Sequence, residues 1–442
     1  MLVNKLVVSV YVAALFAASS TCDAAEKPNI LLIFTDDQGR GDVSCYGSEI
    51  PTPNIDSLAR DGVKFENWYV AAPVCTPSRF ALLTGMYPNR SQDLLLGALM
   101  SLGPEDATRG IQTGETTLAR TLRRVGYRTG LVGKWHLGHG RPKFLPTRHG
   151  FDSFYGHTAG CIDFFTMRYG VKPDWYRNEK LIDEIGYATD LITAEAVRFL
   201  NAQSDEKAFF LYLAYNAPHF GKGYDPGKKQ VVNIMQAKPA DLARVDHIDD
   251  PTRRVFGGMV VSLDDGIGRV LTALRRNGLD DNTLVIFMTD HGGDLDYGGN
   301  NGPLRGEKNT LFEGGIRVPC LMRWPEKLKA GTVSRQHGSA LDIVPTVSSI
   351  VGAEVEGHRT DGIDLTPHLL DGKTISRELF WRLKVGDAYR DGDWKYLKVT
   401  DKEDMLFNLK LDPNEKSNVA KEHPDALKKL KSKHAVVVGS FN

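Results

Sequence analysis

Cys75 occupies a position in which a thiol could do chemistry rather than fill space. It opens the segment CTPSRFALLTG, in which Pro77 suits the first turn of a helix and Gly85 suits its end. Backbone N–H groups and the dipole at a helix N-terminus favour anions, and Arg79 lies one turn further on. A packing role explains none of these neighbours, so we interpret Cys75 as part of a site that handles an anion.

Three carboxylates follow two apolar runs and indicate a cation site. Asp36 and Asp37 are adjacent, and Asp290 precedes His291 and two glycines. Crowded carboxylates repel one another, and a bound cation relieves this repulsion. Oxygen ligands favour Ca²⁺ or Mg²⁺ over Zn²⁺. His291 is an uncommon ligand for Ca²⁺ and is equally suited to bind substrate, and a solvated turn is the alternative for the aspartate pair.

Four further polar residues are suited to an anionic substrate. Lys134 and His136 are two apart in a strand-like run, a spacing that places both side chains on one face. An edge strand with polar residues outward would give the same pattern. His219 follows an apolar run, and Lys308 lies in a loop rich in Gly and Asn. A lone histidine is commonly structural and a loop lysine is commonly solvated. Neither residue therefore indicates a site by itself, and the prediction depends on the four residues occurring together.

The elements that must position these residues alternate between strands and helices. We expect buried strands at 29–34, 130–136, 209–215 and 282–288, and helices at 118–125, 189–201 and 256–277. This alternation predicts an α/β fold, a large mostly parallel mixed sheet flanked by helices. Ligands of such sheets collect beyond the carboxyl ends of the strands. Each of the four runs carries its polar cluster at that end.

The pattern of expected secondary structure changes after residue 357. Short antiparallel strands are expected near 379–381, 389–396 and 405–409, followed by a surface helix over 424–434. We therefore divide the chain into a catalytic domain, 26–356, and a small C-terminal α+β subdomain, 357–442.

Composition and the N-terminus bound the setting in which the protein works. Lys+Arg and Asp+Glu both number 55, which argues against nucleic acid as the main partner. Residues 1–25 read as a signal peptide, with Lys5 before an apolar run that is too short to span a bilayer. We expect export to the periplasm or beyond, with lipidation at Cys22 as the less favoured alternative and no transmembrane segment. Among Cys45, Cys161 and Cys320 we expect at most one disulfide, or three free thiols.

Taken in order, these motifs resemble the formylglycine-dependent (type I) sulfatases of the alkaline phosphatase superfamily. The segment CTPSR matches the family's C-x-P-S-R signature, and GKWHLG, APH, TDHG and EGG follow in the expected order. The resemblance covers nearly the whole chain after residue 25. Within the family, the motifs most resemble those of carbohydrate and N-acetylgalactosamine-6-sulfatase-like members. It implies hydrolysis of a sulfate ester on a sulfated saccharide, with release of inorganic sulfate.

The resemblance also implies a role for each candidate residue. A maturation enzyme would convert Cys75 to Cα-formylglycine, and the hydrated aldehyde would attack sulfur with help from Arg79. Lys134 and Lys308 would bind sulfate oxygens, His219 would protonate the leaving sugar oxygen, and His136 would deprotonate the second hydroxyl. The implied ligands of Ca²⁺ are Asp36, Asp37, the modified Cys75, Asp290 and His291.

Other interpretations stay open at this point. The loop GHTAGCID has no serine at the place where some relatives carry a hydroxyl, and His157 and Asp163 are candidate sugar contacts, with loop packing as the alternative. An arylsulfatase, a phosphodiesterase or a phosphonate hydrolase of the same superfamily is the second interpretation. An inactive protein that binds sulfated glycans is the third.

Overall fold

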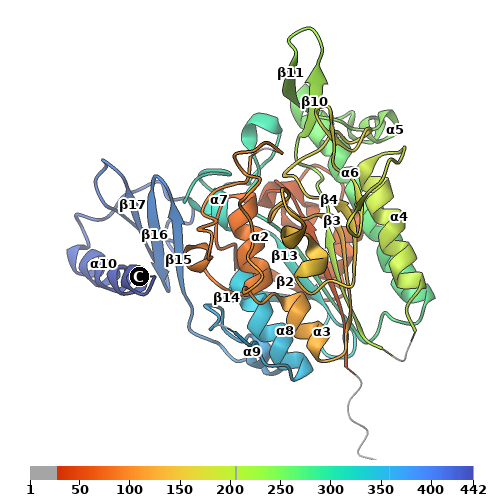
Figure 1. The fold of residues 1–442 in the computed structure, drawn as a ribbon. Coiled ribbons are helices and arrows are strands. Elements are labelled where there is room, and N and C mark those ends of the chain that lie inside the picture. The colour runs from red at the N-terminus through yellow and green to blue at the C-terminus, as the bar shows by residue number, and fades with distance from the viewer. Residues whose placement is uncertain (1–26, 101, 205–206, 358, 442) are drawn as a thin grey trace, which may run out of the picture.

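A ten-stranded mixed sheet forms the centre of the molecule (Figure 1). The computed structural model describes residues 27–100, 102–204, 207–357 and 359–441, so the predicted signal peptide lies outside the described residues. The strands of the sheet, in spatial order, are β14 (Thr332–Ser339), β2 (Val63–Tyr69), β13 (Cys320–Arg323), β12 (Thr283–Thr289), β1 (Asn29–Thr35), β9 (Phe209–Ala214), β3 (Arg128–Lys134), β4 (Ser153–His157), β7 (Tyr176–Arg177) and β8 (Lys180–Leu181).

The central strands are parallel and buried on both faces. β1 pairs in parallel with β12 and β9, and β3 pairs in parallel with β9 and β4. Side chains alternate along a strand, so Ile30 and Leu32 pack into one core and Leu31 and Ile33 into the other. The predicted fold class is confirmed, and the four predicted runs end at the same edge of the sheet.

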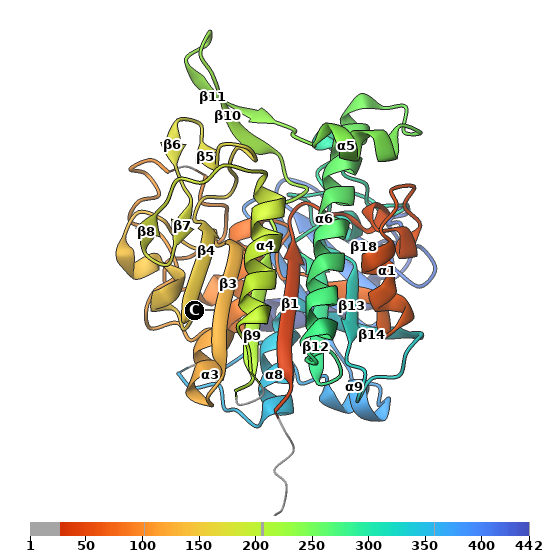
Figure 2. The same cartoon turned by 90° about the vertical axis from the view of Figure 1, so that its right-hand side faces the viewer.

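Helices cover both faces of the sheet. Figure 2 shows α4, α6 and α1 on one face, and Figure 1 shows α2, α3 and α8 on the other. The helices are α1 (Pro53–Arg60), α2 (Cys75–Thr84), α3 (Leu118–Arg124), α4 (Ala188–Asn201), α5 (Pro239–Leu242), α6 (Pro251–Arg276), α7 (Glu313–Ile316), α8 (Ile343–Val351), α9 (Thr366–Asp371) and α10 (Pro424–Gly439). Two of the predicted helices were too short. α6 begins five residues early, since Asp250 caps it and Pro251 opens it, and α10 continues to Gly439.

A separate four-stranded antiparallel sheet lies beside the main body. It consists of β15 (Glu378–Leu383), β16 (Gly386–Asp391), β17 (Trp394–Val399) and β18 (Met405–Asn408), and α10 packs against it. Trp381 is buried and donates its indole N–H to the carbonyl of Val70, 2.6 Å away, which fixes this sheet to the larger one. The domain boundary at residue 357 stays a prediction.

Smaller pieces complete the described chain. Two hairpins lie outside the large sheet, β5 (Arg168–Tyr169) with β6 (Lys172–Pro173), and β10 (Gly221–Asp225) with β11 (Gln230–Ile234). Among the helices of the described residues, none is long and apolar enough to cross a bilayer. Cys45, Cys75, Cys161 and Cys320 are all free thiols, which decides the open question about a disulfide.

The placement of His136 on a strand was wrong. β3 ends at Lys134, and His136 has a φ of +55°, in the left-handed region. Such backbone is rare for residues other than glycine and is concentrated at functional sites. The side chains of Lys134 and His136 therefore lie near each other because the chain turns after β3, and not because both project from one face of a strand.

Candidate active site

The candidate residues meet at the carboxyl edge of the sheet. Asp36 and Asp37 follow β1, Asp290 and His291 follow β12, and His219 follows β9. Lys134 is the last residue of β3, Cys75 is the first of α2, and Lys308 comes from the loop before α7. The catalytic and metal residues expected from the sequence are thus brought together from six segments.

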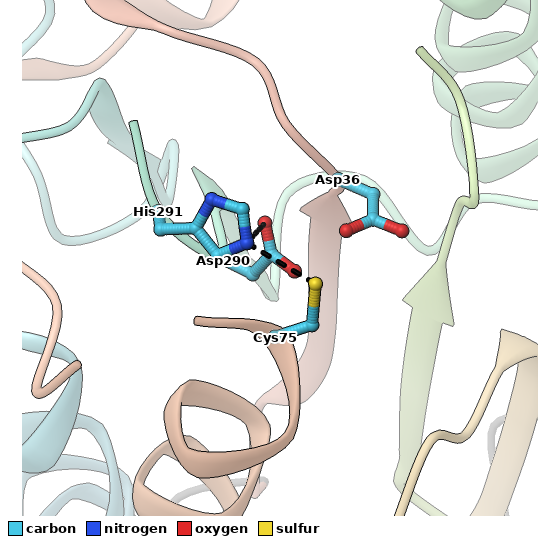
Figure 3. A group of neighbouring side chains, drawn as sticks. All are labelled: Asp36, Cys75, Asp290 and His291. Carbon is cyan, nitrogen blue, oxygen red and sulfur yellow. Dashed lines mark hydrogen bonds and ion pairs between the residues drawn. The ribbon is translucent and has the colours of Figure 1, made fainter. Parts of the chain in front are cut away.

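Cys75 stands at the centre of the cluster. Figure 3 shows its sulfur between Asp36 on one side and Asp290 and His291 on the other, and Sγ lies 3.2 Å from Nε2 of His291. α2 is completely buried and ends at Gly85 with φ +70°, as the sequence predicted. Burial opposes ionisation of the thiol, but Lys134, Lys308 and His291 together hold the pKa of Cys75 well below its ordinary value.

The carboxylates have unused acceptors that fit a hard cation. Asp36 and Asp37 are at most 1 % exposed, and in each the Oδ1 atom has no hydrogen-bond partner among the described residues. Buried polar atoms are normally paired, and an unpaired charge is especially unfavourable. Single atoms of Asp36, Cys75, Asp290 and His291 lie within 4.8 Å of one another. This donor set could hold a cation that prefers oxygen, such as Ca²⁺ or Mg²⁺.

The ionisation of these groups agrees with a place for one more positive charge. Burial would raise the pKa of Asp36, but Lys134 and other cations hold it well below its ordinary value. Burial and the nearby Asp36 raise the pKa of Asp290 well above its ordinary value. Burial lowers the pKa of His291, yet Asp290 and Cys75 raise it to about 10. The lowered pKa of Asp36 reflects the cations around it, and the raised pKa values of Asp290 and His291 reflect the negative charge of the neighbouring carboxylates and thiol.

Three permanent cations take the remaining carboxylate oxygens. Lys134 pairs with Oδ2 of Asp36, and Lys308 donates to Oδ2 of Asp37 over 2.9 Å. Arg79 is fully buried and donates to Oδ2 of Asp290 over 3.2 Å. Three carboxylates are therefore matched by three cations, so a bound divalent ion would leave the pocket positive and able to attract an anion.

The two histidines occupy different sides of this cluster. Nε2 of His219 lies 3.1 Å from Nζ of Lys308 and 3.5 Å from Oδ2 of Asp37. Nε2 of His136 lies 2.9 Å from the carbonyl of Leu99, and burial together with Lys134 lowers the pKa of His136. A histidine kept neutral in this way can accept a proton near Cys75.

The two predicted sugar contacts sit in structural surroundings. His157 is fully buried, with Nδ1 3.0 Å from the carbonyl of Ala159, and its ring stacks on that of Trp175. Asp163 accepts from the backbone N–H groups of Phe165 and Thr166 and so closes a loop. Contact of either side chain with a sugar stays a prediction.

Several contributors to the site carry no strong signal in the sequence. Asp37 has a φ of +62°, in the left-handed region that residues other than glycine rarely adopt. A Cβ on Gly292 would lie 1.7 Å from the carbonyl oxygen of Gly314, so only glycine lets the segment after β12 approach α7 this closely. The carbonyl of Leu99 orients His136 from a distant loop. Paired glycines after Asp290 were the only available sign of this close packing.

Comparison with known proteins agrees with this geometry. The family model described as "Sulfatase" matches residues 28–353. The chain belongs to the sulfatase family. It is therefore a sulfuric ester hydrolase. It is 36% identical to human N-acetylgalactosamine-6-sulfatase over 81% of this chain and 69% of that one. Bovine arylsulfatase A is 35% identical over 83% and 73%. The solved structure of Ps i-CgsB in complex with k-i-k-neocarrahexaose is 36% identical, covers 92% of each chain and has a TM-score of 0.82.

Proposed function

We propose that this sulfatase hydrolyses a sulfate ester on a sulfated carbohydrate, using Ca²⁺ and a Cα-formylglycine formed from Cys75. The observation that carries the proposal is the buried group of Cys75, Lys134 and Lys308 beside two carboxylate oxygens without partners. The names of two relatives support the sugar: one is an N-acetylgalactosamine-6-sulfatase and the other binds a neocarrahexaose.

Asp36, Asp37, Asp290 and His291, with the modified residue 75, would hold the Ca²⁺. The ion would supply positive charge next to the reacting oxygen at residue 75. Arg79 is fully buried, and its ion pairs with Asp36 and Asp290 fix the guanidinium below the cation site. Conversion of Cys75 by a formylglycine-generating enzyme would supply a geminal diol, one hydroxyl of which attacks sulfur.

The surrounding side chains would bind the sulfate and move the protons. Lys134 and Lys308 would contact the sulfate oxygens, where negative charge concentrates in the transition state. His219 would donate a proton to the leaving sugar oxygen, and Lys308 beside it would stabilise the charge there. His136 would take the proton of the second hydroxyl as sulfate departs, consistent with its lowered pKa. Removing a single such group commonly reduces turnover about 10²–10³-fold.

The test is sulfate release from a panel of substrates. The panel contains sulfated galactose, N-acetylgalactosamine, glucosamine, fucose and uronate sugars, an aryl sulfate and a phosphodiester. The mass of the peptide that contains residue 75 is measured on the same batch. We expect sulfate release from one carbohydrate ester, and its loss in Cys75→Ala but not in Cys45→Ala, since Cys45 is a free thiol elsewhere.

Three outcomes would contradict the proposal. A preparation with formylglycine at residue 75 that releases sulfate from the aryl ester alone would be an arylsulfatase, and one that prefers the phosphodiester would be a phosphodiesterase. A preparation that binds saccharide but cleaves none, with formylglycine present, would be a binding protein. We also infer export, which is tested by whether the mature protein from a periplasmic fraction begins after residue 25.

A further inference from the structure

A hairpin extends the catalytic edge of the sheet outward. β10 begins two residues after His219, and Figure 2 shows β10 and β11 projecting beyond the edge at which β1 ends. The hairpin is also fixed at its base, because the N–H of Gly170 in the β5–β6 hairpin donates to the carbonyl of Lys222 over 2.9 Å. His219 and the β10–β11 hairpin are thus parts of one continuous surface.

Phe220 links the catalytic residues to the base of the hairpin. Its ring centroid lies 4.0 Å from that of His219 and 4.4 Å from that of Tyr297. The ammonium of Lys308 is 5.5 Å from the same ring and that of Lys222 is 5.4 Å from it. Phe220 and Tyr297 are half-buried. A pair of aromatic rings therefore separates the lysine of the catalytic site from a second lysine further out.

One face of the hairpin continues this pattern. Lys222 and Tyr224 are two apart on β10 and share a face, and their partners across the hairpin are Asn233 and Val231. The Lys222 ammonium donates to the amide oxygen of Asn233, and the Asn233 amide donates to the hydroxyl of Tyr297 over 2.5 Å. Tyr224 is 41% exposed. From His219 outward, the surface offers aromatic rings, a cation with an amide, and another aromatic ring.

This sequence of groups fits an anionic saccharide chain. Sugar rings present C–H faces to aromatic rings and hydroxyl groups to amides, and a second sulfate or a carboxylate on the next sugar would meet Lys222. Lys222 is half-buried and bonds to an amide, so its charge is not neutralised by a carboxylate of the described residues. An exposed charge pair is individually weak, but several contacts along a chain add.

We propose that Phe220, Tyr297, Lys222, Asn233 and Tyr224 bind the saccharide on the leaving-group side of the scissile ester. The proposal rests on the proposed function, in which His219 protonates the leaving sugar oxygen and so places that sugar against Phe220. The sugar that carries the ester then contacts Phe220 and Tyr297, the next one reaches Lys222 and Asn233, and a third reaches Tyr224. The preferred substrate is a polyanionic oligosaccharide or polymer, not a single sugar.

The test compares substrates of increasing length. Saccharides of one, two and four sugars are prepared from the sulfated saccharide that the mature enzyme cleaves in the panel, with carrageenan fragments as the first choice. The variants are Tyr224→Ala and Lys222→Met, neither of which contacts the catalytic cluster. Leu411→Ala, which removes another exposed apolar side chain from a distant turn, is the control. Values of kcat, KM and melting temperature are measured for each.

We expect losses that depend on chain length. Tyr224→Ala should raise KM roughly fivefold for the tetrasaccharide and leave the monosaccharide and disaccharide unchanged, in keeping with the loss of one exposed aromatic contact. Lys222→Met should raise KM about threefold from the disaccharide on, with the difference fading as salt is added. Binding of the tetrasaccharide to Cys75→Ala protein, measured by calorimetry, should weaken by the same factors.

Equal losses at every length would assign these residues a structural role and overturn the proposal. Unchanged KM values in both variants, with the wild type active on saccharides, would also overturn it and leave the proposed function intact. A wild-type enzyme that carries formylglycine and cleaves no saccharide would overturn the proposed function and this inference together. Tyr297→Phe keeps the ring and loses the hydroxyl. Its KM should therefore lie between the KM of Tyr297→Leu and that of the wild type.

Discussion

Two buried clusters of charge in this molecule differ in how completely they are paired. The first, which we call the catalytic cluster after its proposed role, is the group of Asp36, Asp37, Cys75, Asp290 and His291 at the carboxyl edge of the large sheet. The second joins the large sheet to the C-terminal sheet, where Lys395 on β17 lies 3.0 Å from Glu313 and 2.8 Å from Glu415. All three of these side chains are fully buried. We call this second group the junction cluster.

Every carboxylate oxygen of the junction cluster lies within 3.0 Å of a donor group, and Oε1 of Glu415, which has no hydrogen bond, is held by its 2.8 Å ion pair with Lys395. The other oxygen of Glu313 accepts from the hydroxyl of Tyr69 over 2.7 Å, and the other oxygen of Glu415 accepts from the N–H of Glu313 over 2.6 Å. In the catalytic cluster, Oδ1 of Asp36 and of Asp37 has no hydrogen bond, and the ion pairs of these two atoms with Arg79 and His291 are longer, at 3.5 Å and 3.4 Å. The difference teaches that burial of charge alone does not mark function. Buried carboxylate oxygens without a close partner are the better sign, because they leave room for a cation to bind.

The largest effect expected from this difference is on cation binding. Asp37→Asn removes the charge of a carboxylate whose Oδ1 has no hydrogen bond, and it should reduce sulfate release at least about 10²-fold. Addition of Ca²⁺ at about 100 times its Kd should stabilise chelator-treated wild type by about 2.7 kcal/mol, or roughly 3 °C in a protein of this size, and should not stabilise Asp37→Asn. Differential scanning fluorimetry with Ca²⁺ and Mg²⁺ in parallel measures the shift.

Glu415→Gln is the matched control, since it changes one buried carboxylate of the paired cluster. It should melt lower than the wild type and keep the full Ca²⁺ shift. A Ca²⁺ shift of equal size in Asp37→Asn would show that the cation binds elsewhere and would remove the distinction between the two clusters.

The junction cluster should respond in stability. Lys395→Met leaves two carboxylates buried without their cation and should lower the free energy of unfolding by about 3–5 kcal/mol, the usual result of breaking a buried pair. The variant is measured by urea unfolding, with activity read at low temperature where it remains folded. Lys398→Met, an exposed lysine on the same strand, is the control and should change stability by at most about 0.5 kcal/mol. Loss of turnover that exceeds the loss of folded protein would mean that the junction also shapes the site.

Those features of the fold and the site that depend on local sequence pattern could be predicted from the sequence. Continuous apolar runs predicted β1, β9 and β12, and the convention that ligands gather at carboxyl ends placed Asp36 and Asp290 together. The N-terminal position of Cys75 and the stop at Gly85 followed from helix-end chemistry. These inferences succeeded because each depends on residues close together in the chain.

The parts that depend on tertiary contact were out of reach. His136 was placed on a strand because alternate spacing fits one, whereas the chain turns after Lys134 with a positive φ. The junction cluster joins Tyr69, Glu313, Lys395 and Glu415, which are far apart in sequence and each ordinary alone. Only the order of the family's motifs indicated that Lys308, from a glycine-rich loop, belongs to the site, and its contact with Asp37 was not predicted.

The smallest expected effect is a pH sensitivity at the junction. His337 lies beside that cluster, with Nε2 2.8 Å from the guanidinium of Arg390. Burial, then the charge of Arg390, lowers the pKa of His337 to about 4. An unfolded histidine has a pKa near 6.5, so between these two values the unfolded state binds more protons. Stability contributed by neutral His337 is therefore complete above about pH 6.5 and is lost as the pH falls toward about 4.

Replacing this histidine should flatten the acid side of the stability curve. From pH 7 to pH 5 the melting temperature of the wild type should fall roughly 2 °C more than that of His337→Gln, while His247→Gln, at an exposed histidine, should follow the wild type. Melting temperatures are read in buffers of equal ionic strength without added cation. A parallel fall in all three proteins would mean that Arg390 and His337 move apart on protonation at no cost. The junction cluster would then accept an additional positive charge without loss of stability, as we expect of the catalytic cluster alone.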